Sequence, residues 1–311
     1  MNKLALVLCL LAASAGAQPP PPAATANRKP KLILAIVVDQ FRLDYFYRFA
    51  AQYNGGLARL ASQGAFFTNA HYEHFPTVTA VGHSTFMTGA TPSISGIVGN
   101  DWYDRQSGKQ VTSVEDPATK LLGGTAAATG SSPHRLLVST IADELKMSGQ
   151  ASKAIGISIK DRSAILPVGR MADGAFWFDN KTGNFVSSTF YFPKLPAWVA
   201  QFNDSRAADR YLGREWTSIE DPKAPAFEKI TATKDDKYWA EMQRTPFGNE
   251  LVEELAERAV EAGHLGEDAI TDVLSASFSS NDYVGHEFGP DHPRVRDISI
   301  RTDRTLARLF A

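Results

Sequence analysis

The first candidate core element of this chain is the stretch Lys31-Leu32-Ile33-Leu34-Ala35-Ile36-Val37-Val38-Asp39. Its apolar residues follow one another without the polar alternation of a half-exposed strand. Such a run is typical of a strand buried on both faces, in a parallel sheet flanked by helices. Because α/β sheets bind ligands beyond the carboxyl ends of their strands, Asp39 is a candidate metal ligand or catalytic acid. The alternative is that Asp39 caps a helix or forms a turn.

Two more apolar runs, residues 153–159 and 270–278, predict two more buried strands. The first run ends at Lys160, and Arg162 follows two positions later. In an extended segment these two cations point the same way. Arg grips phosphate oxygens through two parallel hydrogen bonds, and Lys adds a point charge. A solvated charged turn is the alternative for this pair.

The other run, 270–278, is followed by Asp282 and His286. Residues four apart lie on one face of a helix, so this pair presents an oxygen and an imidazole together. Both are ligands of zinc or a similar divalent ion. The alternative is a capping Asp beside a buried, hydrogen-bonded His.

Residues 73–89 combine hydroxyls, a proline and a glycine in a short segment that contains Thr77 and Thr79. Either Thr fits the cap of a helix that starts there, at a position where the backbone favours an anion such as phosphate. The segment therefore suits a nucleophilic Thr, and an ordinary helix cap is the alternative. Asn100 lies in the turn-rich segment 92–104, where Asn is usually a turn former and less often a ligand-facing amide.

These groups converge if the three apolar runs form one parallel sheet, because the carboxyl ends of parallel strands share an edge. The set then contains two acids, a His, a hydroxyl and two cations. A metal lowers the pKa of a bound hydroxyl, and cations hold phosphoryl oxygens while charge shifts. The sequence therefore predicts a site for phosphoryl transfer.

The rest of the chain predicts a mixture of helices, short strands and loops. Helices are expected at 55–64, 133–147, 197–202, 250–263 and 294–310. Short strands are expected at 65–67, 174–179 and 185–192, the last two forming a hairpin. Residues 116–132 are expected to form an irregular loop, and the polar segment 203–245 a surface insertion whose aromatics either pack or face substrate.

Residues 1–17 have the features of a secretory signal: Lys3, a short apolar run and small residues before Gln18. Residues 18–30 predict a flexible Pro/Ala linker. The one cysteine, Cys9, lies inside the signal, so the mature chain has no disulfide and no thiolate ligand. These features predict a periplasmic or secreted protein without a stable membrane anchor after cleavage. The net charge of −2 among 311 residues argues against a nucleic-acid partner.

From about residue 31 to its end, the chain resembles the metal-dependent alkaline phosphatase superfamily, in its type I phosphodiesterase/nucleotide pyrophosphatase branch. Within that branch it is similar to periplasmic bacterial alkaline phosphatases that carry a Lys-x-Arg pair. The motifs that carry the resemblance are Val37-Val38-Asp39-Gln40, Pro76-Thr77-Val78-Thr79-Ala80-Val81-Gly82-His83, Gly99-Asn100-Asp101-Trp102-Tyr103-Asp104, Lys160-Asp161-Arg162, Gly174-Ala175-Phe176-Trp177-Phe178, Thr245-Pro246-Phe247-Gly248-Asn249 and Asp282-Tyr283-Val284-Gly285-His286.

The resemblance implies an α/β fold: a largely parallel central sheet with helices on both faces, in a catalytic domain spanning 31–311 with a cap or insertion at about 174–247. It also implies a small phosphate ester as substrate and two Zn²⁺ as cofactors. Thr79, rather than Thr77, would become phosphorylated. Asp39 would bind one zinc beside Thr79, and Asp282 and His286 would bind the other.

The phosphoryl oxygens would be held by Asn100, Lys160 and Arg162. The Lys-x-Arg pair points to monoesters, whose phosphoryl group carries more charge and more free oxygens than that of a diester. The resemblance therefore predicts a zinc-dependent phosphate monoester hydrolase with a phosphothreonine intermediate.

One departure from the family pattern concerns the metal ligands. The family adds a later Asp-His pair and one more downstream His, whereas only His292 follows His286 in this sequence. A fragment or truncated product is therefore expected, with weak zinc binding and impaired turnover. Two other functions stay open: a phosphodiesterase or nucleotide pyrophosphatase using the same site, and an inactive phosphate-binding or structural protein of the periplasm.

Overall fold

The computed structural model describes residues 29–125 and 128–311. The predicted signal, residues 1–17, and nearly all of the linker predicted at 18–30 lie outside these residues. Among the helices that are described, none combines the length and the apolar character needed to cross a bilayer.

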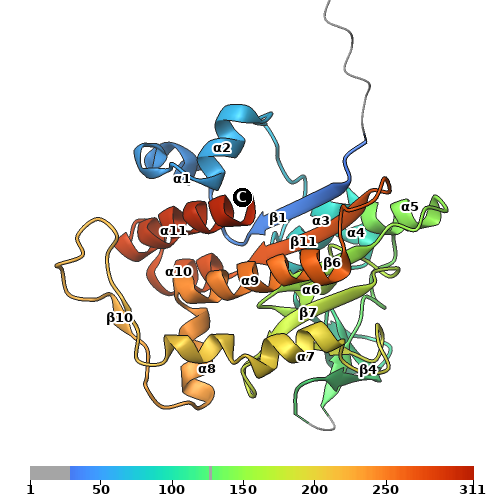
Figure 1. The fold of residues 1–311 in the computed structure, drawn as a ribbon. Helices are drawn as coiled ribbons and strands as arrows, with labels where there is room; N and C mark the ends of the chain where they lie inside the picture. The colour runs from blue at the N-terminus through green and yellow to red at the C-terminus, as the bar shows by residue number, and fades with distance from the viewer. Residues whose placement is uncertain (1–28, 126–127) are drawn as a thin grey trace, which may run out of the picture.

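A seven-stranded sheet runs through the molecule, and its strands are parallel in one half and antiparallel in the other (Figure 1). The parallel strands, in spatial order, are β1 (Leu32–Val38), β11 (Asp272–Phe278), β6 (Ala154–Ser158) and β7 (Gly174–Asp179). The antiparallel strands that follow are β8 (Asn184–Ser188), β4 (Glu115–Leu122) and β5 (Thr129–Ser131). The three strands predicted from unbroken apolar runs are thus neighbours, which confirms the α/β class.

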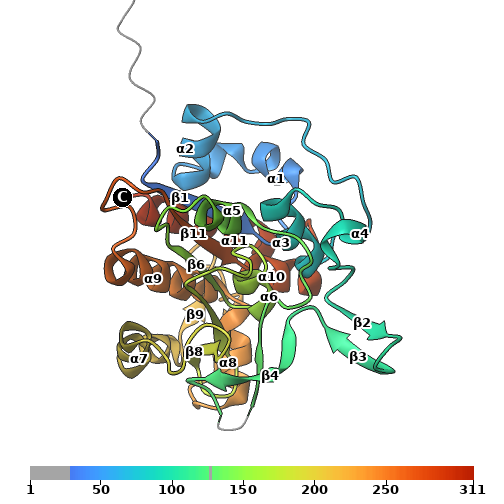
Figure 2. The ribbon, with the colours of Figure 1, turned by 90° about the vertical axis from the view of Figure 1, so that its right-hand side faces the viewer.

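Helices cover both faces of the sheet (Figures 1 and 2). One face packs against a layer that includes α7 (Ala197–Asp204), α8 (Asp236–Gln243), α9 (Pro246–Gly263) and α11 (Pro293–Leu309). The other face packs against α3 (Thr79–Thr88), α5 (Ile141–Met147) and α6 (Asp161–Ile165). The remaining helices are α1 (Leu43–Arg48), α2 (Gly56–Gln63), α4 (Pro92–Ser95) and α10 (Ser280–Phe288), with 3₁₀ turns at Ala50–Gln52 and Ala207–Tyr211.

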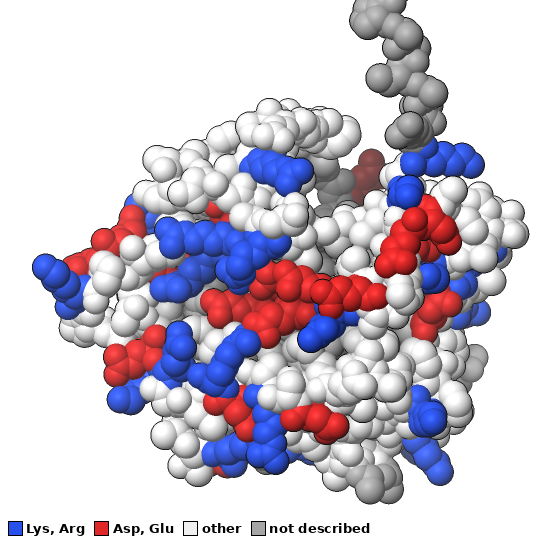
Figure 3. All heavy atoms as spheres, in the orientation of Figure 1, with Lys and Arg blue, Asp and Glu red and all other residues white. Residues whose placement is uncertain are grey.

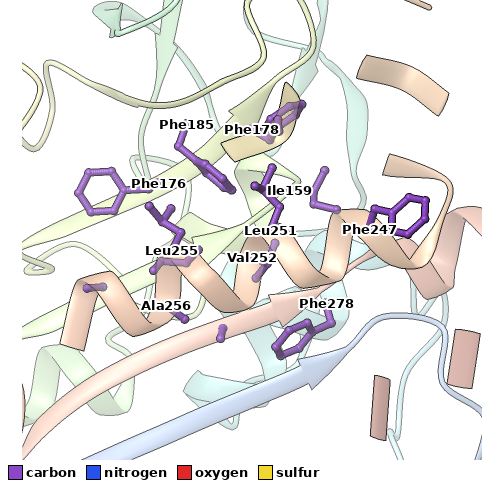
Figure 4. Close-up of a cluster of buried hydrophobic side chains, with 14 of the residues drawn as sticks. Ile159, Phe176, Phe178, Phe185, Phe247, Leu251, Val252, Leu255, Ala256 and Phe278 are labelled. Carbon is purple, nitrogen blue, oxygen red and sulfur yellow. The ribbon is translucent and has the colours of Figure 1, made fainter. Parts of the chain in front are cut away.

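The largest core lies between α9 and the sheet (Figure 4). Leu251 and Leu255 are buried on the face of α9 that meets the strands. Successive side chains of β7 point to opposite faces of the sheet. Phe176 and Phe178 belong to this core, whereas Ala175 and Trp177 belong to the core on the other face. This period of two is what a strand covered on both sides requires.

The outer face of α9 carries acidic side chains that form a stripe, with Lys and Arg side chains on both sides of it (Figure 3). Glu257 and Glu261 of this helix are exposed, and Arg308 of α11 pairs with Glu253 at 3.0 Å. Both signs of charge are therefore interspersed on this face, as is common for a solvated surface.

Several local predictions were wrong. The segment expected as an irregular loop contains β4 and β5. Its Gly, Thr and Pro residues lack a strand pattern, and pairing with β8, far along the chain, imposes the extended form. The helix expected from 133 begins only at Ile141, because Thr140 and Asp143 form a reciprocal capping box. Residues 65–67 form no strand.

The region expected as an insertion at about 174–247 is only partly outside the sheet. Its predicted hairpin exists, but β7 and β8 are strands of the central sheet. The segment beyond it contributes β9 (Glu215–Trp216) and β10 (Glu228–Lys229), a separate small ladder. Tyr211 and Trp216 are buried, so these aromatics pack within the molecule. A second small ladder joins β2 (Asp101–Asp104) to β3 (Lys109–Thr112).

Candidate functional site

The ends of three adjacent strands bring Asp39, Lys160 and Asp282 together. Asp39 follows β1, Lys160 follows β6, and Asp282 lies in the first turn of α10 directly after β11, the strand between them. The Lys160 Nζ donates to Asp39 Oδ2 at 2.8 Å and to Asp282 Oδ2 at 2.5 Å. The Lys160 side chain is 4% exposed and each carboxylate side chain 10%. The sheet order thus builds a buried acid–lysine–acid group.

Thr79 completes this group from α3. It is the first residue of α3, after Val78 at the cap position, so it is not the side-chain cap that the sequence allowed. Its Oγ1 donates to Asp39 Oδ2 at 3.3 Å and lies 3.5 Å from Lys160 Nζ. Thr77 is exposed. The structure therefore places Thr79, and not Thr77, in contact with the acid and the lysine.

Asn100 is positioned by the start of α3. Its Oδ1 accepts a hydrogen bond from the backbone N–H of Ala80 at 2.8 Å, which satisfies one of the free donors in the first helical turn. Because the carboxamide oxygen is used in this way, the NH₂ group is the end that remains to donate. The turn residue expected from the sequence is thus held at the first turn of α3, next to Thr79.

Arg162 lies at the start of α6, near the group but outside it. Its guanidinium pairs with Asp161 at 3.6 Å, and its Nε is buried without a hydrogen-bond partner in the described part of the chain. Its positive charge helps to lower the pKa of Asp39. The extended segment in which Lys160 and Arg162 would point the same way does not form, because α6 begins directly after Lys160.

His286 contacts Asp282 but reaches into solvent. Its Nε2 lies 3.2 Å from Asp282 Oδ1, across one turn of α10, and its side chain is 70% exposed. Asp282 thus uses one oxygen for His286 and the other for Lys160. The structure confirms that Asp282 and His286 share one helix face.

A buried chain of hydrogen bonds beneath the site was missed by sequence reasoning. His83 Nδ1 lies 2.7 Å from the Thr79 carbonyl oxygen, which can only accept, so Nδ1 carries the proton. His83 Nε2 then accepts from Ser277 Oγ at 2.7 Å. The Ser277 carbonyl accepts from Ser158 Oγ at 3.0 Å, and Ser158 Oγ accepts from the Lys160 backbone N–H at 3.3 Å. The one available signal was the spacing of four between Thr79 and His83.

Electrostatics in the site follow from burial and from Lys160. Burial raises the pKa of Asp39, but the positive charge and hydrogen bond of Lys160 outweigh it, and the net pKa lies below its ordinary value. Burial lowers the pKa of His83, so this histidine is neutral at neutral pH. Burial also raises the pKa of Tyr283, whose ring centroid lies 4.9 Å from Lys160 Nζ.

Backbone strain accompanies the site at Gln40, directly after Asp39. Gln40 has a φ of 57°, in the left-handed region that non-glycine residues rarely adopt. Gly285 of α10 packs against the Gln40 side chain and leaves no room for a Cβ. Strain of this kind persists where the surrounding structure enforces it, often at functional sites. A hollow of about 450 Å³, lined by Asp39, Thr79 and Phe86 among others, opens beside this turn.

The donor atoms near Lys160 are of the kinds that bind zinc, but each group of them contains too few ligands for a zinc site. Two carboxylates, a hydroxyl and an imidazole are suitable donors for zinc. They form two pairs, Asp39 with Thr79 and Asp282 with His286, whereas a zinc site takes at least three protein ligands. Within residues 29–125 and 128–311, no group of three His, Cys, Asp or Glu side chains is arranged to hold a metal. A cation does lie between the pairs, and it is the Lys160 ammonium.

The chain is similar to known proteins in sequence and in fold. A sequence model described as type I phosphodiesterase / nucleotide pyrophosphatase matches residues 33–311. The alkaline phosphatase PhoV of Synechococcus elongatus is 40% identical over 304 residues, which are 91% of this chain and 55% of PhoV. The crystal structure of the alkaline phosphatase PafA of Elizabethkingia meningoseptica superposes with a TM-score of 0.83 at 38% identity, over 91% of this chain and 59% of that one.

A second PafA structure, of a variant, matches with the same TM-score of 0.83 at 37% identity, over 91% of this chain and 59% of that one. In that variant a threonine, an asparagine, a lysine and an arginine are substituted. The chain spans about half the length of the curated relatives that it matches.

Proposed function

This chain belongs to the type I phosphodiesterase/nucleotide pyrophosphatase family, and from this membership we propose that it carries the nucleophile and phosphate-binding half of a phosphate monoester hydrolase. The single observation that supports the proposal best is the contact of Thr79 Oγ1 with both Asp39 and Lys160. A hydroxyl that donates to a buried carboxylate beside a buried ammonium has a proton acceptor and a cation within reach.

In the proposed reaction the Thr79 Oγ1 attacks the phosphorus of a small phosphate ester, and its proton passes to a neighbouring base. Asp39 Oδ2 is the acceptor that the hydroxyl already contacts. The bond to the leaving alcohol oxygen breaks, and that oxygen gains a proton. Water then cleaves the phosphothreonine, so ester and water give alcohol and inorganic phosphate, and Thr79 is regenerated.

Asn100, Lys160 and Arg162 are the proposed donors to the phosphoryl oxygens. The start of α3 adds its helix dipole, which favours an anion at that position. The Arg162 Nε is buried and unpaired among the described residues, which suits a donor that an arriving anion satisfies. Three donors around one phosphoryl group favour a monoester, since a diester offers fewer free oxygens.

Zinc is the proposed metal, with Asp39 and Thr79 supplying ligands on one side and Asp282 and His286 on the other. Bound zinc would lower the pKa of a coordinated hydroxyl and neutralise phosphate charge. These pairs do not complete a zinc site, so no catalytic step is assigned to the metal. We also propose a periplasmic or secreted location, which rests on the leader pattern of residues 1–17.

The experiment is turnover of an aryl phosphate monoester with zinc, combined with mass spectrometry for a phosphoryl group on Thr79. Thr79→Ala should abolish both turnover and labelling, whereas Thr77→Ala should retain them, and Thr79→Ser should retain part. Lack of any effect of Thr79→Ala would refute the assignment.

Two other functions are tested by the same measurements. The family description includes phosphodiesterases, and faster turnover of an aryl diester than of the monoester would favour that activity. Phosphate binding without turnover is the other alternative, because within the described residues no three His, Cys, Asp or Glu side chains are arranged to hold a metal. Vanadate binding that Thr79→Ala leaves unchanged, with no hydrolysis, would support a binding role.

A further inference from the structure

The mismatch between the ligand set and a zinc site points to the role of Lys160. We propose that the Lys160 ammonium is a tethered counter-cation that occupies the cation position between Asp39 and Asp282, and that a divalent metal binds these carboxylates only after this side chain moves away. This inference rests on the metal ligands of the proposed function, but not on catalytic turnover.

The distances support competition for the same oxygens. Lys160 Nζ contacts Oδ2 of Asp39 at 2.8 Å and Oδ2 of Asp282 at 2.5 Å. Zinc binds carboxylate oxygens at about 2.0–2.2 Å, so an ion on either oxygen would lie close to this ammonium. Because the Lys160 side chain is only 4% exposed, water screens the repulsion between the two cations poorly.

The carboxylates explain why a lysine fills the position. Asp39 and Asp282 are buried, and two buried anions without a cation are strongly unfavourable. Lys160 supplies one positive charge that both carboxylates share, and its two contacts join residues that follow β1, β6 and β11. A divalent metal supplies two positive charges, so it would compensate the two carboxylates more fully than the lysine does.

The Lys160 side chain can also move away from the two carboxylates. Its flexible four-carbon stem allows the ammonium to move while the backbone stays fixed by Ser158. Lys160 Nζ already lies 4.9 Å from the centroid of the Tyr283 ring, and an ammonium that moves off the carboxylates can keep this contact. Arg162, two residues later, contacts neither carboxylate and pairs with Asp161, so it provides a control of equal charge.

The first test is zinc affinity, measured by competition with a chromophoric chelator. Lys160→Met should bind Zn²⁺ at least about tenfold more tightly than the wild type. Arg162→Met removes the same charge and should change the affinity by no more than about threefold. Asp282→Asn should weaken binding. Equal or weaker binding by Lys160→Met than by Arg162→Met, or no binding by any of the proteins, would overturn the proposal.

The second test uses the unmodified chain, so it does not depend on the folding of a variant. Each lysine is acylated with an amine-reactive ester, and labelling is quantified by mass spectrometry with and without saturating Zn²⁺. Lys160 should be protected without zinc and labelled several-fold faster with it, while Lys229, 67% exposed, should label equally in both. Protection of Lys160 that zinc leaves unchanged would refute the displacement.

Discussion

Two buried carboxylate sites in this protein are stabilised in opposite ways. Asp303 of α11 is fully buried and accepts hydrogen bonds from four backbone N–H groups at the start of α2, those of Asn54, Gly55, Leu57 and Ala58. Asp39 and Asp282 instead share the movable ammonium of Lys160. Fixed backbone donors compensate the first site, and a flexible side chain compensates the second.

The difference separates a structural site from the site that we propose binds metal and phosphate. The backbone donors around Asp303 cannot leave without unfolding the start of α2, and Gly55 and Gly56 lie so close to α11 that a Cβ would clash with Asp303 and Leu306. The cation between Asp39 and Asp282 can be exchanged for another. A buried charge with fixed partners stabilises the fold, whereas one with an exchangeable partner is available for binding.

The largest loss of stability is expected when Asp303, the carboxylate with fixed backbone partners, is replaced. Asp303→Ala leaves four backbone donors without their acceptor and should lower the free energy of unfolding by about 4 kcal/mol, measured by urea denaturation. Asp104 also accepts from two backbone N–H groups, but on an exposed hairpin. Asp104→Asn should therefore have a much smaller effect. Similar losses in the two variants would contradict the distinction.

The second largest loss of stability is expected when Lys160, the shared partner of Asp39 and Asp282, is replaced. Lys160→Met leaves two buried anions unpaired and should cost about 3 kcal/mol near pH 7 without metal. In the wild type the pKa of Asp39 lies below its ordinary 3.8, so its stabilising contribution is lost as pH falls below that value. In Lys160→Met, burial raises the pKa of Asp39. Acidification from pH 7 therefore protonates this carboxylate and removes the unfavourable free energy of its buried charge. Urea unfolding should show that the difference in the free energy of unfolding between the wild type and Lys160→Met becomes smaller from pH 7 to pH 4. A difference that stays constant would contradict this prediction.

A smaller loss of folding stability is expected from substitution of His83, which lies beneath the site. His83→Phe removes the hydrogen bonds to Thr79 and Ser277 and should cost about 2 kcal/mol. The pKa of His83 is lowered from 6.5 in the fold, so the unfolded chain takes up its proton first as pH falls below 6.5. The wild type should therefore lose stability between pH 7 and pH 5 more steeply than the variant. A pH slope that is equal in the wild type and in His83→Phe would contradict this prediction.

The smallest effect separates stability from binding at Asn100. Asn100→Ala removes the acceptor for the Ala80 N–H and should cost about 1 kcal/mol. Asn100→Asp keeps an acceptor oxygen at that position but removes the NH₂ donor. It should keep most of the stability and lose vanadate affinity, as isothermal titration would measure. Retained affinity in Asn100→Asp would exclude the donor role.

The core strands were predictable because their signal is local. The apolar runs at 32–38, 153–159 and 270–278 have the composition of strands buried on both faces, and they became β1, β6 and β11. Strands β4 and β5 were not predictable, because Pro117 and the Gly- and Thr-rich residues around it lack a strand pattern, although β4 pairs with β5 and with the distant β8. The start of α5 was missed because the capping box at Thr140 outweighed the helical pattern before it.

The meeting of Asp39, Thr79, Lys160 and Asp282 was predictable from sheet topology, but the contacts among them were not. The different contacts of Arg162 and Lys160 depend on where α6 begins, and one hydrogen bond of His83 depends on Ser277, which is far away in the chain. The roles of these residues in binding and catalysis stay predictions, to be decided by the experiments above.

By itself the amino-acid sequence determined the class of fold, its buried strands and the polar residues at their ends, because these follow from composition and spacing along a few residues. Only the tertiary structure decided that a lysine lies between the two acids, that His83 binds the carbonyl of Thr79, and that Asp303 joins α11 to α2. Such contacts depend on burial and on distances between segments far apart in the chain, and neither is fixed until the sheet and its helices have packed.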